Sequence, residues 1–139
     1  MFQNGQAQVL AEDPRAPGSN ANFIMDAEDM VRFGTPMPWD AEPNGEHSFR
    51  IADLAFFSPE TLRRLTEETY RRLKVDPARM PVSRYTFSVG QLKTPMGDFM
   101  VPSPDGKVTL EIRVEAANGM DGGWVAYSAA GKAFDVMMP

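Results

Sequence analysis

The sequence predicts an α+β fold: an antiparallel β-meander of four to five strands packed against one main helix over 58–74, preceded by a long extended N-terminal arm. Three observations lead to this prediction. A helical start signal is followed by apolar residues at helical spacing. Short apolar–polar alternations separated by turn sequences fill the last third of the chain. The first 45 residues are rich in proline, glycine and asparagine and show neither pattern.

The main helix begins at a clear start signal. Ser58 is a favourable N-cap, and Pro59 occupies the first helical position, where its missing N–H removes no hydrogen bond. Phe57 and Leu62 stand at the two positions of a hydrophobic staple. The residues expected to face the core are Leu62, Leu65, Thr69 and Leu73, with Tyr70 beside them. The charged pairs four residues apart, expected on the solvated face, are Arg63/Glu67, Arg64/Glu68, Glu67/Arg71 and Glu68/Arg72.

The strands follow from alternation of apolar and polar residues. The run 107–115 alternates strictly between aliphatic and polar or charged side chains, so one face of this strand is expected to be buried and the other wet. Turn sequences at 103–106 and 118–123 bracket this run. The predicted strands, which together make the meander, are 85–89, 99–101, 107–115, 124–128 and 133–138.

Two domains of different character are predicted, an extended arm over 1–45 and a single α+β domain over 46–139. Within the arm, Asp26 is a candidate N-cap and Gly34 a stop signal, which favours a short helix over 26–33. The two prolines of 35–40 favour an extended backbone there. The run 47–57 is ambiguous between strand and helix, and we interpret 48–52 within it as a short strand.

The net charge of −5 is distributed unevenly. Residues 1–57 carry nine acidic and three basic side chains, residues 58–80 four and six, and residues 81–139 six and five. An acidic arm can therefore lie against the mildly basic helix of its own or a neighbouring copy, through surface pairs of about 0–1 kcal/mol each. Nucleic acid is not an expected partner, because such binding needs a basic stripe that glutamates do not interrupt.

Few residues offer catalytic or metal-binding chemistry. The chain has no cysteine and His47 is its single histidine, which excludes metal sites built from thiolates or from two imidazoles. A nucleophile elbow and a phosphate-binding glycine loop before the helix are both lacking. We therefore expect no metal and no cofactor, and we lean toward a protein that is not an enzyme. No run approaches the ~18 apolar residues of a membrane span, so no membrane association is expected.

These observations favour a non-catalytic structural or assembly subunit that docks through its arm on copies of itself or on other protein subunits. A terminus of this composition becomes ordered when it docks on its own domain or on a partner. Virions use small cysteine-free domains with extended termini in this way, so we expect the chain in the cytoplasm or in a virion or other particle assembled inside the cell. The residues expected to contact the partner are Phe23, Met25, Met30, Phe33, Met37 and Trp39.

Two alternatives remain open at this stage. Trp39 can anchor the arm in a partner or in the core of its own domain, because an indole buries ~150–250 Å² in either place. The chain can also be a small ligand-binding domain or enzyme with a pocket between sheet and helix, or an adaptor whose arm becomes ordered on one dedicated partner. The residues expected to line that pocket are His47, Arg84, Tyr85, Trp124 and Tyr127.

Overall fold

The computed structural model describes residues 49–89 and 104–139 and, outside these ranges, the backbone of six strands. The chain divides into two compact units, Met1–Gly45 and Glu46–Pro139, called here the N-terminal and the C-terminal unit. Within the part of the chain that is described, no helix combines the length and the apolar composition needed to cross a membrane.

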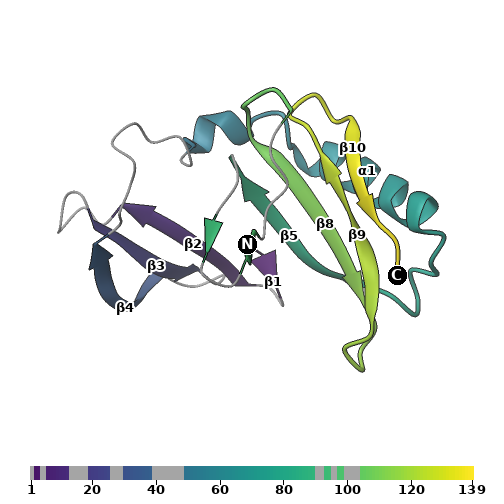
Figure 1. Ribbon diagram of the computed structural model, residues 1–139, viewed down its shortest axis with the longest axis horizontal. Coiled ribbons are helices and arrows are strands. Elements are labelled where there is room, and N and C mark those ends of the chain that lie inside the picture. Colours follow the sequence, from purple (N-terminus) through teal and green to yellow (C-terminus); the bar gives the residue numbers. More distant parts are fainter. Residues whose placement is uncertain are drawn as a thin grey trace. The chain divides into compact units, whose positions relative to one another are not determined.

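The C-terminal unit contains an antiparallel sheet of four strands with one main helix across a face of it, so the predicted fold class is confirmed (Figure 1). The four strands lie in the sheet in the same order in which they follow one another along the chain, so the sheet is a meander. A separate two-stranded ladder joins β6 (Lys93–Thr94) to β7 (Gly97–Asp98), and the predicted strand over 99–101 lies outside the described residues. The four strands of the sheet are β5 (Val82–Ser88), β8 (Thr109–Glu115), β9 (Asp121–Tyr127) and β10 (Ala133–Met137).

The main helix, α1 (Pro59–Leu73), forms as predicted. Ser58 is its N-cap, with the side-chain oxygen accepting a hydrogen bond from the backbone N–H of Thr61 at 3.2 Å. Lys74 ends the helix in the left-handed conformation, with a φ of 56°. Ion pairs along the solvent-exposed face are those of Arg63 with Glu67, Arg64 with Glu68 and Arg72 with Glu68.

The interior between α1 and the sheet is filled by side chains from both. Leu65, Thr69 and Leu73 of α1 are buried, as the helical spacing predicted. The Tyr127 hydroxyl of β9 lies 2.9 Å from the Thr69 hydroxyl and 3.1 Å from the carbonyl oxygen of Leu65. The tyrosine itself has no exposed surface, so its hydroxyl group is satisfied entirely by the helix. The buried apolar residues of this core are Phe57, Leu65, Leu73, Val108, Leu110, Ile112, Val114, Val125 and Tyr127.

A short 3₁₀ helix, η1 (Ile51–Leu54), includes the last two residues of the strand predicted over 48–52, and residues 49–50 belong to no strand, so this prediction was wrong for the described residues 49–52. The reason is local hydrogen bonding by Asp53. Its carboxylate accepts a bond from the Arg50 backbone N–H at 2.7 Å, and its own N–H donates to the Arg50 carbonyl at 2.9 Å. These reciprocal bonds stabilise a helical turn that apolar spacing alone does not specify.

The N-terminal unit is extended wherever it is described, and its strands pair with one another in antiparallel order β1-β2-β3-β4. The described residues of this unit are therefore consistent with the predicted extended arm. Residues 30–33 belong to a strand, where the second half of the predicted 26–33 helix was expected; residues 26–29 lie outside the described part. A helix of two turns is marginal in water, and pairing with β3 gives these backbone groups partners. The four strands are β1 (Phe2–Gln3), β2 (Gln6–Glu12), β3 (Ser19–Met25) and β4 (Met30–Pro38).

The hydrogen bonds of Tyr127 can be tested by removing its hydroxyl. Tyr127→Phe should lower the free energy of unfolding by about 1–2 kcal/mol, because the buried Leu65 carbonyl and Thr69 hydroxyl lose a partner. Tyr85→Phe is the matched control, since its hydroxyl meets Thr66 at 3.0 Å in a partly exposed position and should cost less. Urea denaturation measures the loss of stability in both variants. Equal losses would contradict the conclusion that the buried hydrogen bonds of Tyr127 contribute more to stability than the bond of Tyr85.

Gly123 marks a close approach of three segments, where a side chain cannot fit. Its φ is +89°, and a Cβ atom there would collide with the Met137 carbonyl oxygen and contact the Leu73 side chain. Gly123→Ala should therefore destabilise the fold by about 2–5 kcal/mol. Gly106 has a similar φ of +68° but open space around it, so Gly106→Ala should cost only about 1–2 kcal/mol. Thermal or urea unfolding that gives the two variants the same stability would refute this packing.

Candidate functional site

The predicted pocket residues lie on opposite faces of the sheet. Tyr85 and Tyr127 face α1, where their hydroxyls contact Thr66 and Thr69. Side chains alternate between faces along a strand, so Arg84 and Trp124, each one position from a residue of the helix face, lie on the far face. His47 lies outside the described residues. The structure therefore does not gather this set into one pocket between sheet and helix.

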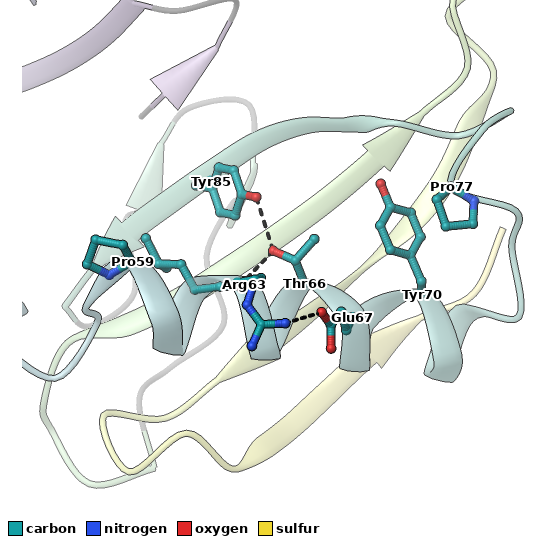
Figure 2. Close-up of a pocket in the computed structure, with 8 residues that line it drawn as sticks. Pro59, Arg63, Thr66, Glu67, Tyr70, Pro77 and Tyr85 are labelled. Atoms are coloured by element: carbon teal, nitrogen blue, oxygen red, sulfur yellow. Dashed lines mark hydrogen bonds and ion pairs between the residues drawn. The ribbon is translucent and has the colours of Figure 1, made fainter.

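A shallow groove of about 630 Å³ runs along α1 beside β5 (Figure 2). Tyr85 lies on the strand side, with its hydroxyl turned toward Thr66 on the helix. The ring of Tyr70 lies farther along the same helix, and burial raises the pKa of its hydroxyl. Arg63 and Glu67, paired with each other, lie at the outer side of the helix. The residues that line the groove are Pro59, Leu62, Arg63, Thr66, Glu67, Tyr70, Pro77 and Tyr85.

The groove offers apolar contact more than chemistry. The Thr66 hydroxyl donates to the Leu62 carbonyl at 2.8 Å and meets the Tyr85 hydroxyl at 3.0 Å, so the polar groups of the groove already bond one another. Its two tyrosine rings and two prolines present flat apolar surfaces, of the kind that contact extended peptides. Such a surface can bind a peptide but holds no evident acid–base pair for catalysis.

A second feature is the far face of the sheet, where four side chains line up across the strands. Arg84 of β5 pairs with Arg113 of β8, Arg113 with Trp124 of β9, and Trp124 with Met137 of β10. Cross-strand partners share a face of the sheet. We call Arg84, Arg113, Trp124 and Met137 the cross-strand row. It begins with two guanidinium groups and ends with an indole and a thioether.

Two carboxylates lie close to Arg113 of the row. An oxygen of Glu111 is 3.7 Å from Nε of Arg113, and Oδ2 of Asp121 is 3.6 Å from Nη1 of the same arginine. Burial raises the pKa of Glu111, while the charges of Arg113 and Arg84 act to lower it. Both distances exceed a hydrogen bond, so these ion pairs are loose.

Sequence reasoning identified two members of the row and missed the other two. Arg84 and Trp124 are among the residues expected in a pocket, whereas Arg113 falls on the wet face expected for 107–115 and Met137 falls in the strand predicted over 133–138. The alternation of 107–115 does place Arg113 opposite the core. The alternation does not reveal the register between the strands, which aligns Arg113 with Arg84 and with Trp124.

Five of the six residues predicted to bind a partner lie on the paired strands β3 and β4. Met25 pairs with Met30 at one end of the ladder, and Phe33 pairs with an asparagine farther along. Phe23 lies in β3 and Met37 in β4. Trp39 lies outside the described residues, so the choice between its two predicted roles stays open.

Among the residues that the structure describes, no three histidine, cysteine, aspartate or glutamate side chains form a group that could hold a metal ion. Comparison of the chain with protein-family models, with curated proteins and with solved structures finds no match. The two surfaces are therefore interpreted from the chemistry of their own residues.

The environment of Glu111 predicts a pH dependence of stability. A raised pKa means that the folded chain binds a proton at Glu111 more readily than the unfolded chain does, so ionised Glu111 lowers stability above its folded pKa. This penalty should vanish as the pH falls toward 4.5, the ordinary value of the group. We expect wild type to gain stability relative to Glu111→Gln between neutral pH and about 4.5. Urea unfolding at several pH values in this range measures the difference in free energy of unfolding between the two proteins. A difference that does not change with pH would contradict the conclusion that burial raises the pKa of Glu111.

Proposed function

We propose that this chain is a non-catalytic assembly subunit that binds a protein partner through its N-terminal unit. The observation that carries the proposal is the separation of charge between the two units. Residues 1–45 hold seven acidic and two basic side chains, a net charge of −5, while residues 46–139 hold twelve of each and are neutral. A small acidic unit attached to a neutral one is suited to binding a neighbour by charge as well as by shape.

The C-terminal unit supports this role because it supplies a core of its own. The buried cluster extends from Phe57 to Tyr127 and includes residues of α1, β8 and β9. The C-terminal unit can therefore serve as a folded platform, while the N-terminal unit is used for contacts with other chains. A virion is one particle in which such a subunit would fit, and other multi-subunit particles fit the proposal equally well.

Exposed apolar side chains on the C-terminal unit are a further argument. Met137 is 37 % exposed and Met138 51 % exposed at the end of the chain, next to Val136 at 38 %. Methionine adapts its shape to irregular partner surfaces and is common at such contacts. Large apolar residues near the surface are frequent at protein–protein interfaces.

The alternative function, a ligand-binding domain or enzyme with a pocket between sheet and helix, would need space that the core occupies. Leu65 and Tyr127 meet there with no exposed surface, and Thr69 joins them through its hydroxyl. The α1–β5 groove lies outside this interior and is shallow. We therefore give the assembly role priority.

Deletion of residues 1–45 tests the proposal. Full-length chain should associate with itself or with its partner in light scattering, whereas 46–139 should stay monomeric and retain the circular dichroism of α1 and the sheet. Full-length Trp39→Ala is the companion variant, and loss of association with an unchanged thermal midpoint would identify an intermolecular anchor. A full-length monomer whose N-terminal unit resists protease, and which no protein partner retains, would contradict the assembly role.

A further inference from the structure

The last strand of the sheet has a free edge. β10 pairs with β9 on one side, and none of the strands that the structure describes pairs with its opposite side. A strand at the edge of a sheet presents backbone N–H and C=O groups with which another extended chain can pair. The segment 133–138 adds apolar side chains to this edge, with Val136 38 % exposed and Met138 51 % exposed. Segments of this kind pair readily with other strands unless a structural feature opposes the pairing.

The packing at Gly123 shows which backbone groups of β10 point away from β9. A Cβ atom on Gly123 of β9 would collide with the Met137 carbonyl oxygen, so this oxygen lies against β9. The backbone groups of successive residues in a strand point to opposite sides. The N–H and C=O of Val136, one residue before Met137, therefore point toward the free edge.

The outward-pointing N–H of Val136 already has an acceptor on its own chain. It donates a hydrogen bond to Oδ1 of Asp135 at 2.8 Å. A strand that paired with β10 at this point would have to break this bond, and the carboxylate of Asp135 would then lie beside the new ladder. Placing a charged group next to a buried backbone ladder costs free energy unless a cation accompanies it. Asp135 therefore opposes strand addition through both its hydrogen bond and its charge.

A bulge lies directly beside Asp135. The register of β10 against β9 shifts between Ala133 and Asp135, so Phe134 is an extra residue in the ladder. Bulges bend an edge strand and interrupt the row of backbone groups that a further strand would need. A charged side chain and a bulge are two features by which proteins protect the edge of a sheet, and β10 has them at adjacent positions.

We propose that Asp135 protects the free edge of β10 from pairing with the same edge of a second copy. Two identical edge strands can pair antiparallel about a two-fold axis, and the two Asp135 carboxylates would then lie in one ladder with only five residues from each strand. Like charges close together in a ladder destabilise it. Asp135 lies in the C-terminal unit, so its protective role does not depend on the proposed function of the N-terminal unit.

Replacement of Asp135 tests this role in the full-length chain. Asp135→Val supplies a strand-forming side chain and leaves the Val136 N–H available to an added strand. Sedimentation velocity should show association about tenfold tighter than in wild type, or more, because an uncompensated charge no longer has to enter the contact. Asp135→Thr removes the same charge with a less apolar side chain, and it should also associate more tightly than wild type. It decides the test if Asp135→Val does not fold.

Two controls identify the surface that associates. Glu60→Val makes the same change in charge, also to valine, at an exposed position of α1, and it should leave association as in wild type. Asp135→Val combined with Val136→Pro removes the outward N–H and places a proline where a paired strand needs a donor, so it should abolish the gain in association. Circular dichroism and the thermal midpoint report on the folding of every variant.

Three results would overturn the protective role of Asp135. The first is a folded Asp135→Val or Asp135→Thr variant that associates no more tightly than wild type. The second is a gain in association that persists with Val136→Pro, because the contact would then not be strand pairing at this edge. The third is an equal gain in Glu60→Val, which would assign the effect to the loss of any surface charge. Because each variant is compared with wild type, association through residues 1–45 bears on the proposed function alone.

Discussion

The packing of Tyr127 against α1 is the interaction on which the rest of the C-terminal unit depends. Its hydroxyl bonds to Thr69 and to the Leu65 carbonyl, which sets where the helix lies on the sheet. Because side chains alternate along a strand, facing Tyr127 and Val125 toward the helix turns Trp124 to the other side. The ladder then turns Arg113 and Arg84 outward with it. The cross-strand row is thus a consequence of how the core is packed.

The elements with redundant local signals could be predicted from the sequence. Ser58 and Pro59 specify a helix start regardless of what surrounds it, and the strict alternation of 107–115 admits one buried face. The short strand over 48–52 failed because its apolar spacing suits two structures, and the Asp53 hydrogen bonds that decide between them are not visible in the spacing. Residues 30–33 pair with β3, and this pairing decides their conformation, but a cross-strand partner leaves no apolar periodicity within the paired segment itself.

The candidate site was harder to predict, for a geometric reason. Arg84 and Tyr85 are adjacent in sequence and were both expected in one pocket, but neighbours on a strand face opposite ways. Recovering the row needs the register of three ladders, including the irregular steps at Val82/Arg84 and Arg113/Glu115. One residue of slip would exchange the core face for the far face. Turn lengths and bulges set that register, and composition does not reveal them.

The division of charge also limits which surfaces the proposed assembly role can bring together. Each N-terminal unit carries a net −5, so two such units repel when they approach within a Debye length of about 8 Å. The neutral C-terminal unit exerts no comparable repulsion, and it presents a pair of opposed arginines on its far face. Under the proposed assembly role, a neutral or basic partner surface would avoid the repulsion that contact between two N-terminal units would create. In that role, electrostatics thus disfavours association of the acidic units with each other.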